Sequence, residues 1–328
     1  MLIKYAVIAA SAFLLNAFFI IVLKKISLKR AFFFSKGMPR IGGIAAGLAF
    51  ILTAASSLYI LGNLTQEAAG ILIASAVMLI FGIIDDRREL SIVAKFFTQI
   101  VGIALLILFG VRTYIIYIGD AANIAITALW VLGITNAFNH LDIMDGLAGG
   151  ITVIASCAFL TLSIFHGHSA VMAITLALAG ATASFLSYNL PPAKMYLGNS
   201  GSHFLGFVLA AVAMVISYAP MERKIALVSP ILILGLPILD TAFLVFMRMM
   251  KGKSIFKKSN DHLALRFLKK GHSKNKTLFF MLGLASIYCL SGILITQNSN
   301  MAGIIVVFVM AAASFFVTKR MSSVVIDG

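Results

Sequence analysis

Long apolar stretches, separated by short polar segments, follow one another along almost the whole chain. A helix needs about 20 mainly apolar residues to cross the hydrocarbon core of a bilayer. The pattern therefore predicts an all-α integral membrane protein with about eleven spanning helices, arranged as a single polytopic domain over 1–328. The segment 111–119 also fits a short hairpin. The expected spans are 2–23, 42–62, 67–84, 93–110, 121–138, 147–165, 169–188, 203–218, 225–247, 277–296 and 301–317.

The composition agrees with a membrane protein. Hydrophobic residues make up 61% of the 328 positions and charged residues only 11%, whereas roughly a quarter of the residues in soluble domains are charged. A soluble fold of this length would leave large apolar patches exposed to water. The first apolar stretch follows Lys4 as in a signal peptide, but it lacks a convincing cleavage site. We therefore expect it to be retained as the first span.

The basic residues lie between the apolar stretches, and the net charge is +15. The chain lacks the known groove-reading motifs, so this charge does not indicate nucleic-acid binding. With the N-terminus outside, all basic residues fall in or beside inner loops except Lys4, Arg112, Arg223 and Lys224. Inner loops of membrane proteins are enriched in Lys and Arg. We therefore predict an outer N-terminus, a cytoplasmic C-terminus and a basic cytoplasmic loop over 248–276.

The acidic residues gather on the same predicted inner side, although there are only eleven of them. The charge rule for membrane loops does not require this, because it concerns basic residues. Ionisable side chains at membrane depth are costly and usually functional. Their clustering is therefore the main indication of function. The acids expected on the inner side are Asp85, Asp86, Glu89, Asp142, Asp145 and Asp261, with Asp240 in the inner half of a span.

The first motif with candidate chemistry is FGIIDDRREL (81–90). Asp85 and Asp86 are adjacent at the inner end of an apolar helix, where they repel each other and lose hydration. Such a pair is tolerated where a cation or basic side chains compensate the charge. A metal site and a structural ion-pair cluster with Arg87 and Arg88 are both compatible with this motif.

The second motif is NAFNHLDIMDGLAGG (136–150). Asn136, Asn139, Asp142 and Asp145 recur every three residues, which predicts that they line up on one side of a helical turn. Oxygen-bearing side chains at that spacing suit a hard cation or a polar ligand. A helix cap beside a packed glycine patch is the alternative interpretation.

The third motif, LGNSGSHFLGF (197–207), predicts a turn that begins a helix. The backbone N–H groups of such a turn bind anions such as phosphate, although an ordinary helix start has the same pattern. Tyr196 precedes the motif. It is a candidate for stacking against a base, or else an interfacial anchor.

The basic loop 248–276 forms the fourth region of interest. His262 lies beside Asp261 and one helical turn before Arg266, and the loop charge would attract lipid headgroups and a nucleotide diphosphate. An inner loop with a surface helix also accounts for most of this charge.

Taken in order, these motifs resemble those of the polyprenyl-phosphate N-acetylhexosamine-1-phosphate transferases, and the likeness covers nearly the whole chain. The similar segments are SKGMPRIGG (35–43), DDRREL (85–90), Asn136 to Leu147, GNSGSHFLG (198–206), PILDTAFLVFMR (237–248) and the residues 262–271. The resemblance implies transfer of an N-acetylhexosamine 1-phosphate from a UDP-sugar to polyprenyl (undecaprenyl) phosphate with release of UMP. It also implies a bacterial inner (plasma) membrane protein with a cytoplasmic active site, acting in the first membrane step of cell-surface glycan synthesis.

The chain departs from the family pattern at a few positions. Asn199 stands where the family has an aspartate implied to bind Mg²⁺, and Ile143 replaces a glycine. Ala264 and Leu265 occupy positions where histidines are usual. The loop also lacks the run of three histidines of the muramoyl-pentapeptide branch, which disfavours that branch. Which amino sugar is used stays open.

The resemblance further implies the roles of individual residues. Asp85 and Asp86 bind the metal and activate the lipid phosphate, and Asp142 lies close to the metal and the diphosphate. Asn199 is an uncharged metal ligand, the metal being Mg²⁺ with Mn²⁺ as the alternative. A second copy of the chain is a candidate partner. The substrate-binding candidates are Asp145, Asn189 and Tyr196 for uridine, Ser202 for the phosphates, His262 and Arg266 for the diphosphate or sugar, and Asn136 and Asn139 beside them.

Two other functions fit parts of the pattern. A transporter or lipid flippase also contains buried acids, but carriers place their polar residues near the bilayer midplane. Here they lie at inner helix ends, apart from Asp240. A relative that binds nucleotide sugar with weak or no turnover is the second alternative, because Asn199 carries no charge.

Overall fold

The chain forms helices almost throughout in the computed structural model, which describes residues 2–30, 34–35, 37–116, 118–218, 222–254 and 260–324. The residues fall into two compact units, Met1–Ser217 (unit 1) and Tyr218–Gly328 (unit 2). That the whole chain acts as a single domain stays a prediction.

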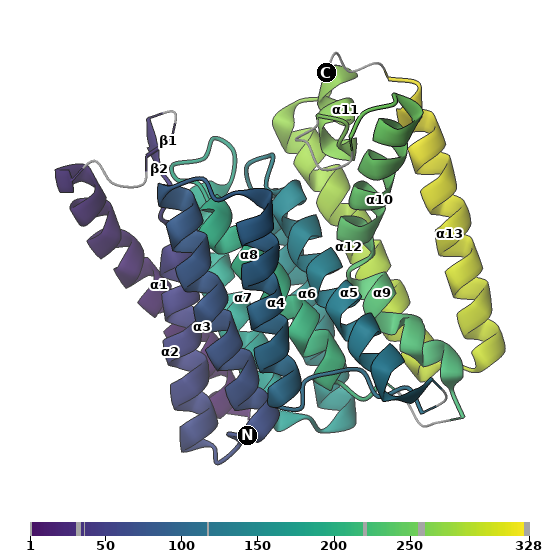
Figure 1. Cartoon of the computed structure of the whole chain (residues 1–328), viewed down its shortest axis with the longest axis horizontal. Helices are drawn as coiled ribbons and strands as arrows, with labels where there is room; N and C mark the ends of the chain where they lie inside the picture. Colours follow the sequence, from purple (N-terminus) through teal and green to yellow (C-terminus); the bar gives the residue numbers. More distant parts are fainter. Residues whose placement is uncertain are drawn as a thin grey trace. The chain divides into compact units, whose positions relative to one another are not determined.

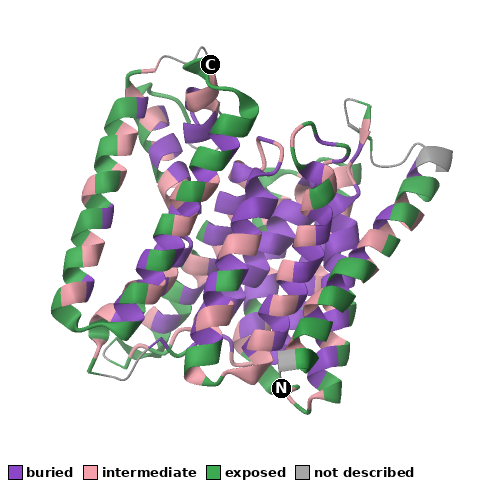
Figure 2. Ribbon diagram, turned by 180° about the vertical axis from the view of Figure 1, so that it is seen from behind, coloured by how far each residue is buried: buried purple, intermediate pink, exposed green. Residues whose placement is uncertain are grey.

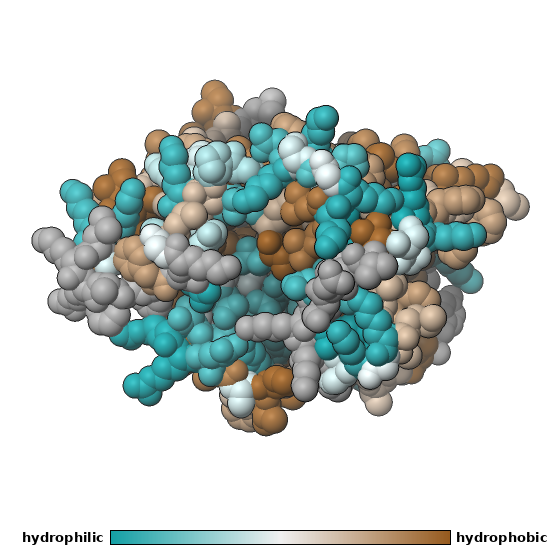
Figure 3. Space-filling model, turned by 90° about the horizontal axis from the view of Figure 1, so that it is seen from above, coloured by the Kyte–Doolittle hydropathy of each residue, from teal (hydrophilic) through white to brown (hydrophobic). Residues whose placement is uncertain are grey.

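Unit 1 is a bundle of long helices with one short hairpin (Figure 1). Consecutive helices alternate in direction, so the loops near 40, 90, 144 and 194 lie at one end of the bundle, and Figure 3 shows that hydrophilic side chains cover much of this end. The elements are α1 (Leu2–Arg30), β1 (Phe34–Ser35), β2 (Met38–Pro39), α2 (Gly42–Ile60), α3 (Gln66–Arg87), α4 (Ile92–Leu108), α5 (Gly119–Leu141), α6 (Leu147–His166), α7 (Ser169–Asn189) and α8 (Gly198–Val215).

Helix α8 is at the centre of unit 1. Every residue from 200 to 213 is buried, and the helix packs against α2, α3, α5 and α6. Figure 2 shows the buried residues concentrated in the middle of this bundle. A helix that is apolar on all sides is buried by its neighbours, so the sequence of α8 explains its central place. The site described below is built around its N-terminus.

Unit 2 contains η1 (Lys224–Val228), α9 (Ser229–Ile233), α10 (Gly235–Met250), α11 (Leu263–Lys269), α12 (Lys274–Gln297) and α13 (Asn300–Ser322). The chain bends by 72° between the segment that ends at Ile233 and helix α10. The short helix α11 lies within the basic loop 248–276, but it is not simply a surface helix, because Leu263, Ala264 and Arg266 are buried. Residues 255–259 of that loop lie outside the described part of the chain.

Nine helices in the described part of the chain are long and apolar enough to cross a membrane: α1, α2, α3, α5, α6, α7, α8, α12 and α13. Large apolar side chains on the outer faces are exposed, such as Phe97 (64%) and Phe308 (75%). Exposed apolar surface of this extent belongs in lipid rather than in water. The prediction of an all-α integral membrane protein is therefore confirmed.

Each of the eleven predicted spans contains a helix, but two differ from the expected form. Helix α4 has only 17 residues, and the span expected at 225–247 is bent. The described residues of 111–118 form a loop rather than a hairpin, and Asn123 binds both the N–H and the C=O of Ile115 in this loop. The number of spans and the orientation stay predictions.

Candidate active site

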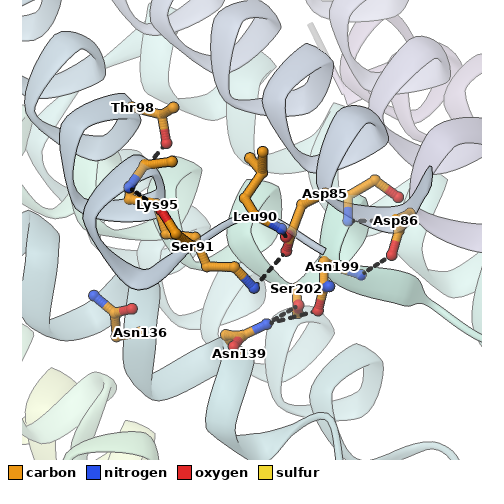
Figure 4. A network of polar contacts seen from close by, with 12 residues as sticks. Asp85, Asp86, Leu90, Ser91, Lys95, Thr98, Asn136, Asn139, Asn199 and Ser202 are labelled. Atoms are coloured by element: carbon orange, nitrogen blue, oxygen red, sulfur yellow. Dashed lines mark hydrogen bonds and ion pairs between the residues drawn. The ribbon is translucent and has the colours of Figure 1, made fainter. Parts of the chain in front are cut away.

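The adjacent carboxylates of α3 point to different neighbours (Figure 4). One oxygen of Asp85 accepts the N–H of Leu90 at 2.8 Å, and the other lies 2.8 Å from Nζ of Lys95 on α4. Asp86 instead accepts the backbone N–H groups of Asn199 at 2.8 Å and Ser200 at 2.9 Å. Consecutive helix positions differ by about 100°, so the two side chains face α4 and α8 respectively.

Asp86 lies at the N-terminus of α8, where free backbone N–H groups and the helix dipole favour a negative charge. Gly198 has φ +77°, and a Cβ at this position would lie 2.7 Å from Asp86 Oδ2. This turn therefore requires glycine. The predicted helix start is confirmed, and the anion bound here is the Asp86 carboxylate. Binding of a substrate phosphate by this turn stays a prediction.

The glycine-rich segment before α2 lies against the same turn. The N–H of Tyr196 donates to the C=O of Pro39 at 3.0 Å, and the N–H of Gly43 donates to the C=O of Leu197 at 2.9 Å. A Cβ on Gly43 would lie 2.2 Å from Cα of Gly201. The two backbones approach so closely that only glycine fits. Three motifs far apart in the sequence, at 35–43, 85–90 and 198–206, thus meet at one place.

Helix α5 contributes two asparagines to this region. Asn139 Nδ2 donates to Asn199 Oδ1 at 3.2 Å and to Ser202 Oγ at 3.0 Å (Figure 4). Asn136 instead forms two hydrogen bonds with Gln99 of α4, at 2.9 and 3.2 Å. Of these two asparagines, Asn139 is therefore the one that contacts the N-terminal turn of α8.

Asp142 and Asp145 lie beyond the end of α5, which is Leu141. The prediction that they share one helical face with Asn136 and Asn139 is therefore wrong, because the helix ends before them. Burial, and then the nearby charge of Asp86, raise the pKa of Asp142 to about 7, although the positive charge of Arg40 opposes the shift. The carboxyl groups of Asp86 and Asp142 are thus close enough to repel each other when both are charged.

The turn after α5 is tied to the loop that precedes α8. Asn189 Oδ1 accepts the N–H of Gly146 at 2.9 Å, and Asn189 Nδ2 donates to the C=O of Met195 at 2.8 Å. Asp145 Oδ2 accepts the N–H of Ala193 at 3.4 Å. These contacts hold the two loops together just before Tyr196. The uridine-binding roles predicted for Asp145, Asn189 and Tyr196 stay predictions.

The remaining candidates belong to unit 2. His262 Nδ1 lies 2.7 Å from Asp240 Oδ2, with both side chains buried. Arg266 lies 2.5 Å from Asp261 and donates to the C=O groups of Met321 and Val324 at 2.8 and 2.6 Å. Arg266 thus connects α11 to the end of α13. Diphosphate or sugar binding by His262 and Arg266 stays a prediction.

Sequence reasoning did not place Arg40, Lys95 or His203 in the site. Arg40 acts electrostatically on Asp86 and Asp142, and its position directly before Ile41 and two glycines was an available signal. Lys95 was also recognisable, because it is a lone charge in an otherwise apolar helix. His203 gave no comparable signal, since the family motif specifies no residue type at its position.

The sequence matches the family model described as glycosyl transferase family 4 over residues 68–217. The chain is 29% identical over 286 residues to the probable undecaprenyl-phosphate N-acetylglucosaminyl 1-phosphate transferase of Bacillus subtilis, covering 84% of this chain and 78% of the relative. It is 30% identical over 314 residues to the decaprenyl-phosphate N-acetylglucosaminephosphotransferase of Mycobacterium tuberculosis, covering 84% and 77%. The phospho-N-acetylmuramoyl-pentapeptide-transferase of Lactobacillus gasseri is 29% identical over 266 residues, covering 76% and 82%.

The matched region 68–217 contains three of the motifs, and their residues meet at the N-terminus of α8. The similarity to the mycobacterial relative extends well beyond this region. The resemblance drawn from the ordered motifs is thereby confirmed. The chain belongs to glycosyl transferase family 4 and, within it, to the polyprenyl-phosphate N-acetylhexosamine-1-phosphate transferases.

Proposed function

We propose that this protein transfers an N-acetylhexosamine 1-phosphate, of the N-acetylglucosamine class, from a UDP-sugar to a polyprenyl phosphate at the cytoplasmic membrane face and releases UMP. The observation that carries the proposal is the convergence of Asp86, Asn139, Asn199 and Asp142 at one end of a bundle of apolar helices. The names of the similar proteins, which act on undecaprenyl or decaprenyl phosphate, support it.

The location of the site suits two substrates that arrive from different phases. A polyprenyl phosphate moves within the bilayer and presents its phosphate at the surface, whereas a nucleotide sugar arrives from water. In the proposed reaction, an oxygen of the lipid phosphate attacks the β-phosphorus of the UDP-sugar. The bond from this phosphorus to the oxygen that leaves with UMP breaks. The protein contributes mainly by positioning the substrates and stabilising charge.

The residues present fit a hard divalent cation. Asp86 and Asp142 supply carboxylate oxygens and Asn199 an amide oxygen, which are ligands that Mg²⁺ prefers. In the described part of the chain, no three His, Cys, Asp or Glu side chains form a ready-made metal group. Mg²⁺ usually keeps several waters and takes only one or two carboxylates, so Asp86 and Asp142 would suffice as its charged ligands. Bound there, Mg²⁺ or Mn²⁺ would reduce the repulsion between anionic substrates.

The geometry also suggests how the aspartates divide their work. Asp85 is oriented by Lys95 and Leu90 on the side of α4, whereas Asp86 lies at the N-terminus of α8. We assign activation of the lipid phosphate to Asp85. Asp86 and Asp142 are the better-placed metal ligands, since the like charges of this pair need compensation.

The decisive experiment is an assay of UMP release. Purified protein in vesicles that contain polyprenyl phosphate is incubated with Mg²⁺ and, separately, with UDP-N-acetylglucosamine, UDP-N-acetylgalactosamine and UDP-N-acetylmuramoyl-pentapeptide. We expect UMP and a lipid-linked product with an N-acetylhexosamine donor, and no UMP without the lipid. Chelation by EDTA should stop the reaction, and Mg²⁺ or Mn²⁺ should restore it.

Two outcomes would contradict the proposal. Folded protein that binds a UDP-sugar but releases no UMP with any donor would favour the weak nucleotide-sugar-binding relative. Movement of a lipid or solute across the vesicle membrane without UMP release would favour a carrier or flippase. Activity that persists in EDTA would show that the reaction needs no divalent cation.

A further inference from the structure

A small chamber lies between α3, α4 and α8, beside Asp85. Its volume is about 10 Å³, which is close to the space that one water molecule requires. Apolar side chains and glycine form part of its wall, and polar groups form the rest. The polar residues of the lining are Asp85, Lys95, Thr98, Gln99 and His203.

His203 is the unexplained member of this lining. It is 6% exposed, and its Nδ1 has no hydrogen-bond partner among the residues that the structure describes. Buried polar atoms in proteins are nearly always hydrogen-bonded to protein or to ordered water. Asp85 and Lys95 are close enough for their charges to act on the ring. The chamber therefore combines an unsatisfied ring nitrogen with room for one small polar molecule.

The opposite side of the chamber offers complementary groups. Lys95 Nζ carries three N–H bonds and lies 2.8 Å from Asp85 Oδ2 as an ion pair. Among the described residues, this ammonium is the only cationic or hydrogen-bonding group found on Asp85 Oδ2. A water here could accept from Lys95 and donate to both Asp85 and His203. Three hydrogen bonds are typical of a buried water.

We propose that this chamber binds one ordered water and that, through it, His203 is a positioning residue for the Asp85 carboxylate. The inference rests on the proposed function in so far as Asp85 acts in the transfer. Its physical basis is that Asp85 lies in the last turn of α3 beside an apolar wall, where a rotated carboxylate would lose the Lys95 contact. Through the water, the Asp85 carboxylate is held by His203 of α8 as well as by Lys95 of α4.

The test compares two substitutions of similar size. His203→Asn keeps a polar amide near the position of Nδ1, whereas His203→Leu fills the space without polar atoms. We expect His203→Leu to lower kcat for UMP release by about tenfold or more, as when groups that orient a site residue are removed, with KM for the UDP-sugar unchanged. His203→Asn should retain most of kcat.

The control is Ser184→Ala on α7. Ser184 is also fully buried, and its Oγ likewise has no partner in the described structure, but it does not line the chamber. Loss of a buried polar atom elsewhere should leave kcat unchanged. A kcat for folded His203→Leu equal to that of the parent would overturn the proposal. An equal loss in the Asn and Leu variants, or a similar loss in Ser184→Ala, would overturn it as well.

A second readout does not depend on activity. A high-resolution map should show one solvent peak within hydrogen-bond distance of His203 Nδ1 and the Asp85 carboxylate, and His203→Leu should lack it. A dry chamber in the parent would overturn the inference even if the enzyme is active. Conversely, a protein with the ordered water but no UMP release would overturn the proposed function and the positioning role of His203, and leave only the water site.

Discussion

Two buried ionic clusters, one in each unit, use similar residues in different ways. In unit 2, Asp240 contacts His262, and Asp261 contacts both Lys251 and Arg266. In unit 1, Asp86 is held by backbone N–H groups of α8, and its charge adds to the rise in the pKa of Asp142 that burial causes. In unit 2 each acid therefore has a basic partner within contact distance, whereas Asp86 and Asp142 act on each other as like charges, which a cation bound between them would offset.

The largest expected effect concerns the unit 2 cluster. Arg266→Met should lower the free energy of unfolding by about 3–5 kcal/mol, because breaking a buried ion pair from one side is strongly destabilising. The C=O groups of Met321 and Val324 would each lose the Arg266 donor, although that of Met321 still accepts the N–H of Val324. Thermal unfolding in detergent measures the change.

Arg266→Met combined with Asp261→Asn should recover part of this loss, since the buried carboxylate that has lost its Arg266 contact is then neutral; the remaining contact of Asp261 with Lys251 limits the gain. An unchanged unfolding temperature together with weaker UDP-sugar binding in Arg266→Met would reverse the comparison, and Arg266 would then belong to the substrate site.

The next effect concerns the unit 1 cluster. Asp86→Asn should reduce UMP release by about 100-fold, in the range found when a group that stabilises transition-state charge is removed, while the protein stays folded. The amide cannot accept from both N–H groups of the α8 turn or supply the charge for a cation. Initial rates at saturating Mg²⁺ provide the measurement.

Asp120→Asn is the matched control for this change. Asp120 is exposed in the first turn of α5, at the other end of its helix from Asp142. Its substitution should leave the rate unchanged. Full activity of Asp86→Asn would mean that the unit 1 acids have no part in the reaction.

A smaller effect is expected where the backbones of α2 and α8 approach each other closely at the site. Gly43→Ala would place a Cβ 2.2 Å from the backbone of Gly201, and overpacking of this kind costs about 1–3 kcal/mol. We expect a lower unfolding temperature and reduced activity at the same time. Gly133→Ala is the control, because its Cβ would meet no atom within 4 Å. Equal stability of both variants would contradict the described contact of α2 with α8.

The smallest effect is expected for Asn199→Asp. An added carboxylate next to Asp86 and Asp142 should strengthen cation binding, so that activity is kept or raised and a lower Mg²⁺ concentration suffices, by a few-fold for one surface-accessible charge. A titration of the rate against Mg²⁺ measures this. A folded but inactive variant would show that the Asn199 amide, which accepts from Asn139, has a different role.

Much of the site was accessible from sequence because its residues occur in short ordered motifs. The adjacent acids 85 and 86, the asparagine series that begins at 136 and the glycine-rich turn at 198 were all recognisable. Their geometry was less predictable. The regular spacing of the second motif suggested one helical face, but α5 ends at Leu141. A three-residue spacing places side chains on one helical face only where the helix continues through all of them.

The amino-acid sequence by itself determined the membrane class, the approximate helices and the family, because apolar length and ordered motifs are local properties of the chain. Only the tertiary structure decided which atoms meet. Asp86 finds its partners 113 and 114 positions later in the sequence, and Arg266 finds carbonyl groups 55 and 58 positions away. Side chains of the same charge acquire different roles from such distant partners, since the surrounding charges and hydrogen-bond donors determine what a buried carboxylate can bind.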